Sequence, residues 1–303
     1  MKDLKTIRGM PDLYDEDVER ISIVENICLE TFKSFNFQEF RTPIVENKSL
    51  FQRSVGESSD IIQKEVYEFE DRNGELLCLR PEGTAGLVRA LITNGLMNDE
   101  IKKFFYLGPM FRYERPQKGR KRQFFQAGAE LIGEESTKSD VEIILLAKTI
   151  LEKLNVKYTL EINYLGKEDS LNLYRSYLRK YLQNFKDELS ERVYARLQRN
   201  PIRAIDSKDS NIQEIFEKAS DISEFLNEEE KESFERTIKS LQDLKIQFNL
   251  NKNLVRGLDY YTGTVFEFIA VGLGAQNAVI GGGRYDNLIK DLGGRDLPAI
   301  GFA

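Results

Sequence analysis

The chain has 303 residues, of which 41% are hydrophobic and 31% charged, and its formal net charge is −6. This composition is typical of a globular protein with a large core, in one large domain or two unequal ones. A negative net charge opposes non-specific adhesion to nucleic acid, although a local basic strip could still bind a phosphate backbone. There is no apolar run of the roughly 18 residues that span a membrane, and the charged N-terminus does not resemble a signal peptide, so we expect a cytosolic protein without membrane contact.

Two residue counts restrict the chemistry that this chain can perform. Cys28 and Cys78 lie far apart and outside any CxxC pattern, so we expect two small core residues and neither a disulfide framework nor a zinc site. The sequence contains 0 histidines, which excludes a Ser-His-Asp triad, histidine-ligated metals and imidazole acid/base catalysis. Any catalysis must use arginine, glutamate, tyrosine, glutamine and backbone groups.

Helical and strand patterns alternate along the chain. Apolar residues recur at helical spacing over residues 18–35, which predicts an amphipathic helix. The next segment, FQEFRTPIV at residues 37–45, predicts a strand that ends or bends at an edge position, because Pro43 lies within it. Further strands are expected at residues 66–69, 76–79, 103–107, 123–130, 158–163, 264–269 and 278–281, and helices at residues 84–93 and 138–154.

This mixture of helices and paired strands predicts an α+β fold with a mainly antiparallel sheet flanked by helices. From residue 167 to residue 246 helix-forming and charged residues dominate, which we interpret as a helical insertion that interrupts one fold. The predicted organisation is therefore one domain in two parts, residues 1–166 and 247–303, with an insertion domain over residues 167–246.

The first motif is RPEGTAG at residues 80–86, where a strand leads through a loop into a helix. Glu82 could receive an ammonium group, and Thr84 could cap the helix and donate to a ligand. A plain capped helix start with an exposed glutamate explains this segment more simply. The motif alone does not indicate a function.

The second motif, FRYERPQKGRKRQFFQAGAE at residues 111–130, has the pattern of a hairpin. Arg112 and Glu114 share one face of the incoming strand, since residues two apart point the same way. Gln126 and Glu130 share one face of the outgoing strand for the same reason. The basic loop could bind phosphates while the strands hold acids for an amine or imidazole; a solvated charged tip is the alternative, but it leaves these matched positions unexplained. The basic loop residues are Arg115, Lys118, Arg120, Lys121 and Arg122.

The third motif combines LVRGLDYYTGTVFEF at residues 254–268 with GGGRYDNL at residues 281–288. Three successive glycines allow a ligand to approach the backbone closely, and they fit a tight turn equally well. Tyr260 and Tyr261 could be core aromatics with tethered hydroxyls, which is the more frequent fate of buried tyrosine. The Walker loop and the GxGxxG fingerprint are both absent, which argues against nucleotide binding of those two types.

Together these segments resemble the histidyl-tRNA synthetases, a family of class II aminoacyl-tRNA synthetases. RGMPDLYDED resembles the family's early sequence, FQEFRTPIVE its motif 1, GPMFRYERPQKGRKRQFFQ its motif 2, and LVRGLDYYTGTVFE and GGGRYDNL its two histidine-specific signatures. The resemblance runs from residue 8 to residue 303 in the family's order. It implies a class II catalytic sheet interrupted by a helical insertion that approaches the tRNA acceptor arm, and a homodimer formed through motif 1.

The resemblance implies that the chain activates histidine with ATP, which is accompanied by Mg²⁺, and transfers it to the acceptor stem of tRNA(His). The implied roles are binding of the α-amino group, recognition of the imidazole ring by Glu130 and Tyr261, and stabilisation of the α-phosphate by the catalytic residues Arg112 and Arg256. The implied histidine-binding residues are Glu82, Gly83, Thr84, Arg112, Gln126, Glu130, Arg256, Tyr260, Tyr261 and Tyr285. The implied ATP-binding residues are Arg112, Glu114, Arg120 and Arg256, and no metal ligand of the protein is expected.

In the implied first step, the histidine carboxylate attacks the α-phosphorus of ATP and expels pyrophosphate. The nucleophile is already an anion and needs no general base, so alignment and charge stabilisation by arginine and Mg²⁺ are enough. A protein without histidine can therefore perform this reaction.

The sequence departs from the family's pattern in two places. Phe125 stands where the family usually has histidine in RQFHQ, and we expect tolerated packing with altered substrate affinity. The sequence ends at AIGFA, where motif 3 begins, so the motif 3 arginine and a C-terminal anticodon-binding domain are absent from it. We expect such a chain to bind histidine, to bind ATP poorly and to charge tRNA slowly or not at all.

Two alternatives remain open. One is a histidine-sensing paralogue of the kind that serves as regulatory subunit of ATP phosphoribosyltransferase, which shares the fold; QAGAELIG at residues 126–133 leans faintly towards it. RPEGT and the basic loop favour the synthetase, because a sensor does not need to hold ATP and an acceptor stem. The other alternative is a structural dimerisation fragment.

Overall fold

The computed structural model describes residues 4–56, 59, 61–98, 100–116, 119–205, 207, 209–272 and 278–303. Within these residues the chain forms an eight-stranded sheet with the order β1-β5-β6-β11-β10-β9-β7-β8. The six inner strands pair antiparallel, and the edge strands β1 and β8 add parallel to β5 and β7. The strands are β1 (Gln38–Glu39), β5 (Lys102–Phe111), β6 (Gln123–Ile132), β7 (Tyr158–Tyr164), β8 (Asn249–Leu250), β9 (Thr262–Ala270), β10 (Ala278–Arg284) and β11 (Ala299–Phe302). The predicted α+β class with a mainly antiparallel sheet is confirmed.

A smaller antiparallel sheet contains β2 (Val45–Asn47), β4 (Leu76–Leu79) and β3 (Glu68–Glu70) in that spatial order. The segment predicted as one strand at residues 37–45 is divided between the two sheets. β1 is the edge of the large sheet, as predicted, and β2 begins after Pro43, which has no N–H to donate to a strand ladder. The expectation of a single strand is therefore wrong beyond residue 39.

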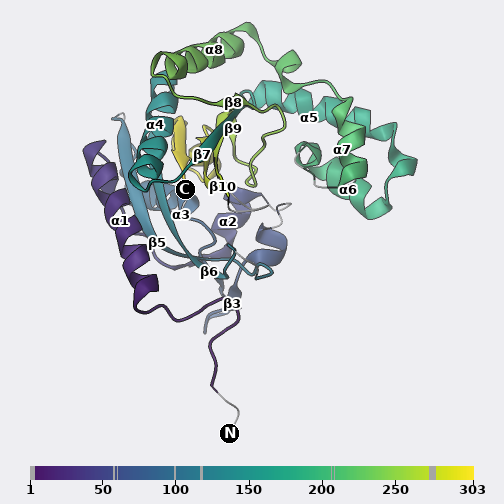
Figure 1. Cartoon of the computed structure of the whole chain (residues 1–303). Helices are drawn as coiled ribbons and strands as arrows, with labels where there is room; N and C mark the ends of the chain where they lie inside the picture. Colours follow the sequence, from purple (N-terminus) through teal and green to yellow (C-terminus); the bar gives the residue numbers. More distant parts are fainter. Residues whose placement is uncertain are drawn as a thin grey trace.

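Helices cover both faces of the large sheet (Figure 1). α1 and α4 lie together on one face, and α3 packs against the opposite face beside α9. The helices are α1 (Glu16–Ser34), α2 (Lys48–Val55), α3 (Thr84–Thr93), α4 (Thr137–Lys153), α5 (Glu168–Gln183), α6 (Glu191–Arg199), α7 (Ser210–Glu217), α8 (Glu228–Asp243) and α9 (Leu288–Asp291), with the shorter turns η1 (Ile61–Glu65), η2 (Lys186–Glu188), η3 (Pro201–Ala204) and η4 (Ile222–Phe225).

The largest apolar cluster lies between the sheet and the α1–α4 layer. Phe32 of α1 stacks on Phe105 of β5 with ring centroids 4.8 Å apart. Cys28 belongs to this cluster, and Cys78 belongs to a second one beneath the small sheet. Both thiols are free and buried, as predicted, and burial raises the pKa of Cys28 to about 11 and that of Cys78 to about 12.

The stretch between β7 and β8 is helical in all of its described regular structure, which agrees with the predicted composition change. In Figure 1, α5, α6 and α7 extend to one side of the sheet, whereas α8 returns to pack on α4. Leu182, Leu197, Ala204 and Ile212 form a small core inside the extension. The interpretation of residues 167–246 as a separate domain remains a prediction. None of the described helices is long and apolar enough to cross a membrane.

Candidate functional site

A cavity of about 60 Å³ lies between the large sheet, the start of α3 and the loop that precedes β9. Two buried carboxyl groups, those of Glu82 and Glu130, border it together with Arg112 and Arg256. Every residue predicted for histidine binding except Gly83 contributes to its wall. The full lining is Glu82, Thr84, Tyr106, Arg112, Gln126, Glu130, Arg256, Leu258, Tyr260, Tyr261, Gly281, Tyr285, Gly301, Phe302 and Ala303.

Glu130 lies on β6 and is only 1% exposed. Three hydroxyl groups donate to its carboxyl oxygens: Thr84 Oγ1 at 2.7 Å, Tyr285 OH at 2.6 Å and Tyr106 OH at 3.4 Å. Burial raises the pKa of Glu130 to about 8, although these hydrogen bonds act in the opposite direction. The carboxyl group is therefore largely protonated at neutral pH, when no ligand faces it.

Glu82 stabilises the start of α3. Its carboxyl oxygens accept hydrogen bonds from the backbone N–H groups of Thr84 at 2.6 Å and Ala85 at 3.0 Å. The helix N-cap is Gly83, so the expectation that Thr84 caps the helix is wrong; its hydroxyl is directed to Glu130 instead. The alternative of an exposed glutamate is also wrong, because Glu82 is buried and this burial raises its pKa.

Arg112 reaches the cavity from beyond the end of β5. The strand ends at Phe111, so the expectation that Arg112 and Glu114 share a strand face is wrong. Arg112 Nε donates to the carbonyl oxygen of Pro81 at 2.9 Å, and its guanidinium lies 5.2 Å from the Phe124 ring centroid. These two contacts orient the guanidinium at the cavity wall.

Two polar atoms in the wall have no hydrogen-bond partner among the described residues. They are the buried atoms Arg256 Nε and Gln126 Oε1. Arg256 contacts Glu267 through Nη1, so its charge is balanced while Nε remains available. Buried polar atoms are normally satisfied, and a bound ligand with an acceptor near Arg256 and a donor near Gln126 would satisfy both.

Glycines bring the site residues into close contact with the backbone. A Cβ at Gly281 would lie 1.8 Å from Arg256 Nη2, and one at Gly301 would lie 1.7 Å from Glu130 Oε2. Gly301 requires glycine, because a Cβ there would also lie 2.6 Å from the backbone oxygen of Ala129. At Gly281 a Cβ would displace the guanidinium of Arg256. The alternative of a tight turn at the GGG segment is wrong, because residues 281–283 lie within β10. The group that approaches Gly281 is the Arg256 side chain, and the approach of a ligand remains a prediction.

Tyr106 is a site residue that the sequence analysis misses. Its ring lies against Gly83 and Gly128, where an added Cβ would come within 2.3 Å and 2.2 Å of ring atoms. In the β5–β6 ladder Tyr106 is paired with Gly128, two positions before Glu130 on the same face. The sequence offers no signal for it, because the pairing of Tyr106 with Gly128 depends on the register of the hairpin.

The predicted ATP residues of the hairpin lie outside the cavity. Glu114 and Arg120 form an ion pair at 2.5 Å. Arg122 stacks over the Tyr113 ring at 3.7 Å, so this basic residue supports the hairpin itself. The other basic loop positions are Arg115 and Lys121, which are exposed, and Lys118, which lies outside the described residues.

Phe125 points away from the cavity, because its neighbour Gln126 points into it and side chains alternate along β6. Its side chain is 42% exposed and stands opposite Pro109 in the hairpin. This exposed position agrees with the expectation that a phenylalanine packs here without disturbing the fold. The expected change in substrate affinity remains a prediction.

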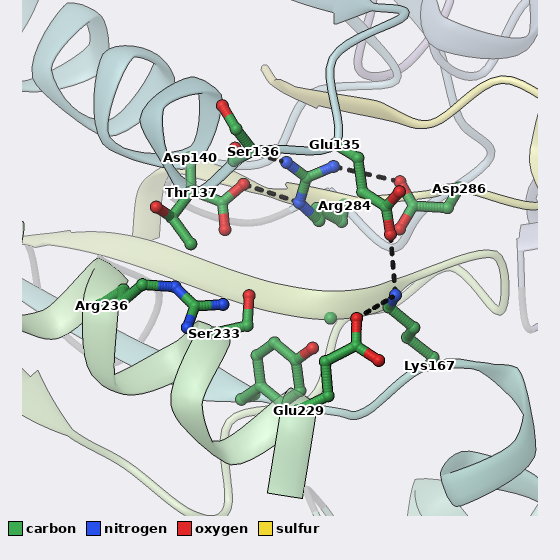
Figure 2. Close-up of a pocket in the computed structure, with 12 residues that line it drawn as sticks. Glu135, Ser136, Thr137, Asp140, Lys167, Glu229, Ser233, Arg236, Arg284 and Asp286 are labelled. Atoms are coloured by element: carbon green, nitrogen blue, oxygen red, sulfur yellow. Dashed lines mark hydrogen bonds and ion pairs between the residues drawn. The ribbon is translucent and has the colours of Figure 1, made fainter. Parts of the chain in front are cut away.

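A second cavity of about 280 Å³ lies behind the site, between the first turns of α4 and α8 (Figure 2). At its floor the buried Arg284 pairs with Asp140 at 2.7 Å and Asp286 at 3.2 Å. Figure 2 also shows Lys167 bridging Glu135 and Glu229 at the mouth. Arg284 and Lys167 are thus already paired, and we interpret the Arg284 cluster as a support for the neighbouring Tyr285.

Comparisons with known proteins identify relatives over nearly the whole chain. A family model described as Histidyl-tRNA synthetase matches residues 9–303. The histidine–tRNA ligase of Hydrogenovibrio crunogenus is 46% identical over 303 residues, which cover 100% of this chain and 71% of that protein. The apo crystal structure of the histidyl-tRNA synthetase of S. aureus is similar at a TM-score of 0.80 and 34% identity, covering 99% of this chain and 71% of the other. A structure from Bacillus halodurans, described as an ATP phosphoribosyltransferase regulatory subunit/histidyl-tRNA synthetase, shares the fold at a TM-score of 0.70 and 22% identity, covering 98% of this chain and 80% of the other.

Proposed function

This chain belongs to the histidyl-tRNA synthetase family, and we propose that the cavity bordered by Glu82, Glu130 and Arg256 is where it activates histidine with ATP to form histidyl-adenylate. Like its relatives, it is an aminoacyl-tRNA synthetase, a ligase that couples histidine to tRNA(His). One observation carries the proposal about the site: side chains from the separate motifs converge on one cavity with two buried carboxyl groups and two arginines.

Histidine binds with its α-ammonium group between Glu82 and Gln126 and its imidazole ring at Glu130. The unpartnered Gln126 Oε1 supplies an acceptor for the ammonium, next to the carboxylate of Glu82. Glu130 faces one ring nitrogen and the Tyr261 hydroxyl faces the other, since imidazole presents two distinct hydrogen-bonding nitrogens. Thr84, Tyr260 and Tyr285 close the pocket around the ring, and Gly83 leaves room for Tyr106.

The substrate carboxylate then lies near Arg112 and attacks the α-phosphorus of ATP. An oxygen–phosphorus bond forms to the carboxylate while the bond to pyrophosphate breaks, so no proton transfer is required. Arg112 and Arg256 stabilise the charge that develops on the phosphoryl oxygens. Arg256 Nε is free to donate to such an oxygen, because only Nη1 contacts Glu267.

ATP lies along the hairpin, with its adenine at Glu114 and its terminal phosphates at Arg120. The Glu114–Arg120 ion pair has to open for this, and Arg120 is the partner that moves, since its side chain is 45% exposed and that of Glu114 only 13%. Mg²⁺ arrives as part of the ATP substrate. The part of the chain that the structure describes contains no group of three or more acidic or cysteine side chains that could hold a metal by itself.

The RNA partner is the acceptor stem of tRNA(His), which binds between the exposed cations of the hairpin and the helical insertion. The reaction takes place in the cytosol. The chain acts as a homodimer. An apolar patch supports this assembly: Val45, Phe69, Leu77 and Leu79 share the outer face of the small sheet. Val45 is 41% and Phe69 is 42% exposed in the single chain.

Histidine-dependent exchange of pyrophosphate into ATP tests this function directly. We expect exchange that requires histidine together with ATP. Histidine binding without exchange would instead indicate the histidine-sensing paralogue whose fold this chain shares. A chain that neither binds histidine nor exchanges pyrophosphate would contradict the proposed site.

A further inference from the structure

Asp259 connects the histidine-specific loop to the helical insertion. Its Oδ1 accepts a hydrogen bond from Asn200 Nδ2 at 2.9 Å and from Arg203 Nη2 at 2.9 Å. Asn200 is the C-cap of α6, and Arg203 lies on η3, so both donors belong to the insertion. The side chains of Arg203 and Asp259 are largely shielded from solvent, at 23% and 20% exposure, which strengthens a charged contact.

Asp259 also contacts the end of α2. Its backbone N–H donates to the carbonyl oxygen of Val55 at 3.3 Å. Gly56 lies against its carboxylate, so a Cβ there would stand 2.6 Å from Oδ2. Gly56 has a φ of +90°, which glycine tolerates far better than other residues. The insertion and the end of α2 therefore both contact the chain at Asp259.

The same region shares an apolar core with the insertion. Leu171 and Tyr174 of α5 and Ile202 of η3 belong to the cluster that contains Val255 and Tyr261. A small cavity of about 20 Å³ lies within this contact, lined among others by Leu171, Ile202 and Tyr261, so the apolar contact does not fix the loop by itself. The hydrogen bonds of Asp259 complete the connection between the insertion and the loop. A shift of the insertion would therefore move the loop of residues 256–261.

We propose that Asp259 is a positioning residue for histidine binding, which fixes the loop of residues 256–261 against the insertion and the end of α2. The proposal rests on the proposed function, because it assumes that histidine occupies the cavity. Arg256 precedes Asp259 by three positions, and Tyr260 and Tyr261 follow it directly; all three border that cavity. The position of the insertion thereby sets the shape of the histidine pocket, before any tRNA is bound. By linkage, histidine must in turn make the insertion more rigid.

The test measures histidine affinity by calorimetry on the 303-residue chain without tRNA. We expect Arg203→Ala and Asp259→Asn each to weaken histidine binding by about 10-fold, a factor within the range of coupled sites. Arg203 does not border the histidine cavity, so a purely local role predicts no change. The double variant Asp259→Asn with Arg203→Ala should lose less than the product of the two single effects, because both variants weaken the same Arg203–Asp259 contact.

Arg179→Ala is the matched control. Arg179 donates to the carbonyl oxygens of Gln198 at 3.0 Å and Arg199 at 3.4 Å, so its contacts are of similar kind but lie within the insertion. It should leave histidine affinity within about twofold of the parent chain. Arg203→Lys, which keeps the charge, should restore part of the affinity lost in Arg203→Ala.

Hydrogen exchange provides a second readout. Histidine should slow amide exchange at residues 200–204 in the parent chain and should not do so in Asp259→Asn. Unchanged affinity in both Asp259→Asn and Arg203→Ala, or an equal loss in Arg179→Ala, would overturn the inference. If the parent chain does not bind histidine at all, the proposed function itself fails, which is a distinguishable result.

Discussion

The carboxyl group of Glu130 is surrounded by neutral donors. Thr84, Tyr106 and Tyr285 contribute hydroxyls, and burial dominates over their hydrogen bonds, so the pKa of Glu130 rises to about 8. Burial also raises the pKa of Glu82, and it raises the pKa values of Tyr106 and Tyr285 well above the usual range. The tyrosines therefore stay neutral between pH 5 and pH 9, roughly.

We predict that histidine affinity is greatest between about pH 6.5, the ordinary pKa of imidazole, and pH 8. The bound pair of Glu130 and imidazole shares one proton. Within this window the free partners together also carry one proton, on Glu130, so binding neither takes up nor releases protons. Below it free histidine is already protonated and binding releases a proton, so affinity falls as the pH falls. Above it neither partner is protonated and binding takes up a proton, so affinity falls as the pH rises.

Calorimetric titrations across this range, with Glu130→Gln as the control, check the prediction. Glutamine does not titrate, so the variant should bind histidine more weakly and should lose the alkaline decline, while its ATP affinity changes far less. Affinity that stays constant through pH 9 in the parent chain, or equal losses for histidine and ATP in the variant, would count against this role of Glu130.

Arg256 is the second residue whose chemistry depends on its surroundings. We expect Arg256→Ala to reduce adenylate formation about 100-fold or more, the usual effect of losing one charge-stabilising donor, with little change in the fold. Gly281→Ala should have a similar effect, since its Cβ would meet Arg256 Nη2 at 1.8 Å. Gly257→Ala is the matched control, because a Cβ there meets no atom within 4 Å. Single-turnover rates near the parent value in Gly281→Ala would contradict this account.

Sequence motifs predicted the site residues that lie within them. They did not predict Tyr106, whose position in the site depends on packing. Glu82, Gln126 and Glu130 belong to recognisable motifs, and all three border the cavity. Tyr106 lies in an alternating strand in which a tyrosine is typical of a core, and its place depends on Gly83 and Gly128. The partner of a glycine across a hairpin depends on register, which the sequence does not specify.

At the scale of elements, α4, β10 and β11 are joined by the buried Arg284. Besides its two carboxylate partners, Arg284 donates to the carbonyl oxygen of Ser136 at 3.0 Å and to Ser139 Oγ at 2.7 Å, both at the start of α4. Asp286 accepts from the backbone N–H of Ala299 at 3.0 Å, which attaches β11 to the same cluster. One guanidinium thus aligns the elements that carry Tyr285 and Gly301.

We predict that Arg284→Met lowers the free energy of unfolding by about 3–5 kcal/mol, because it leaves the buried Asp140 and the partly buried Asp286 without their cation. Urea unfolding measures the loss. The control is Lys290→Met, which removes an exposed ion pair with Asp296 and should leave the urea midpoint unchanged. An Arg284→Met variant as stable as the parent would show that these carboxyl groups are protonated or otherwise satisfied in the folded chain.

The elements that the sequence predicted well have a clear hydrophobic periodicity or form the two strands of one hairpin. The helix expected at residues 138–154 is α4, and the hairpin strands expected at residues 103–107 and 123–130 lie within β5 and β6. β11 was missed although it lies in the middle of the sheet between β6 and β10. All its residues are buried, so the short run AIGF shows no alternation from which a strand could be recognised.

At the scale of the whole molecule, contacts between distant segments decide the architecture, and these are the least visible in a sequence. Asp259 and Arg203 are separated by 56 positions, and Arg284 and Ser136 by 148. Composition indicated a helical insertion, but it could not indicate that α5 and η3 pack on the loop of residues 256–261. The apolar outer face of the small sheet is equally hard to predict from the sequence, because its residues come from three strands.

This outer face is the basis of the prediction for the assembly. Cys78 points into the core, so its neighbours Leu77 and Leu79 point outward, where Phe69 and Val45 stand opposite them. A contiguous apolar face on a monomer is unusual and marks an interface, and the FQEFRTPIV segment that begins this sheet is the one expected to form the dimer. We therefore expect sedimentation equilibrium to find a dimer of the 303-residue chain.

Phe69→Asp should weaken this association by at least about 30-fold, the loss expected when a central interface residue worth 2 kcal/mol is removed. Because Phe69 is exposed in the single chain, the variant should keep the parent's unfolding behaviour once dissociated. Leu173→Asp provides the comparison, since Leu173 is 61% exposed on α5, outside the small sheet. A charge there should leave the association constant unchanged. A dimer that persists in Phe69→Asp with parental affinity would mean that the two copies meet through another surface, and a monomeric parent chain would mean that this apolar face serves a different partner.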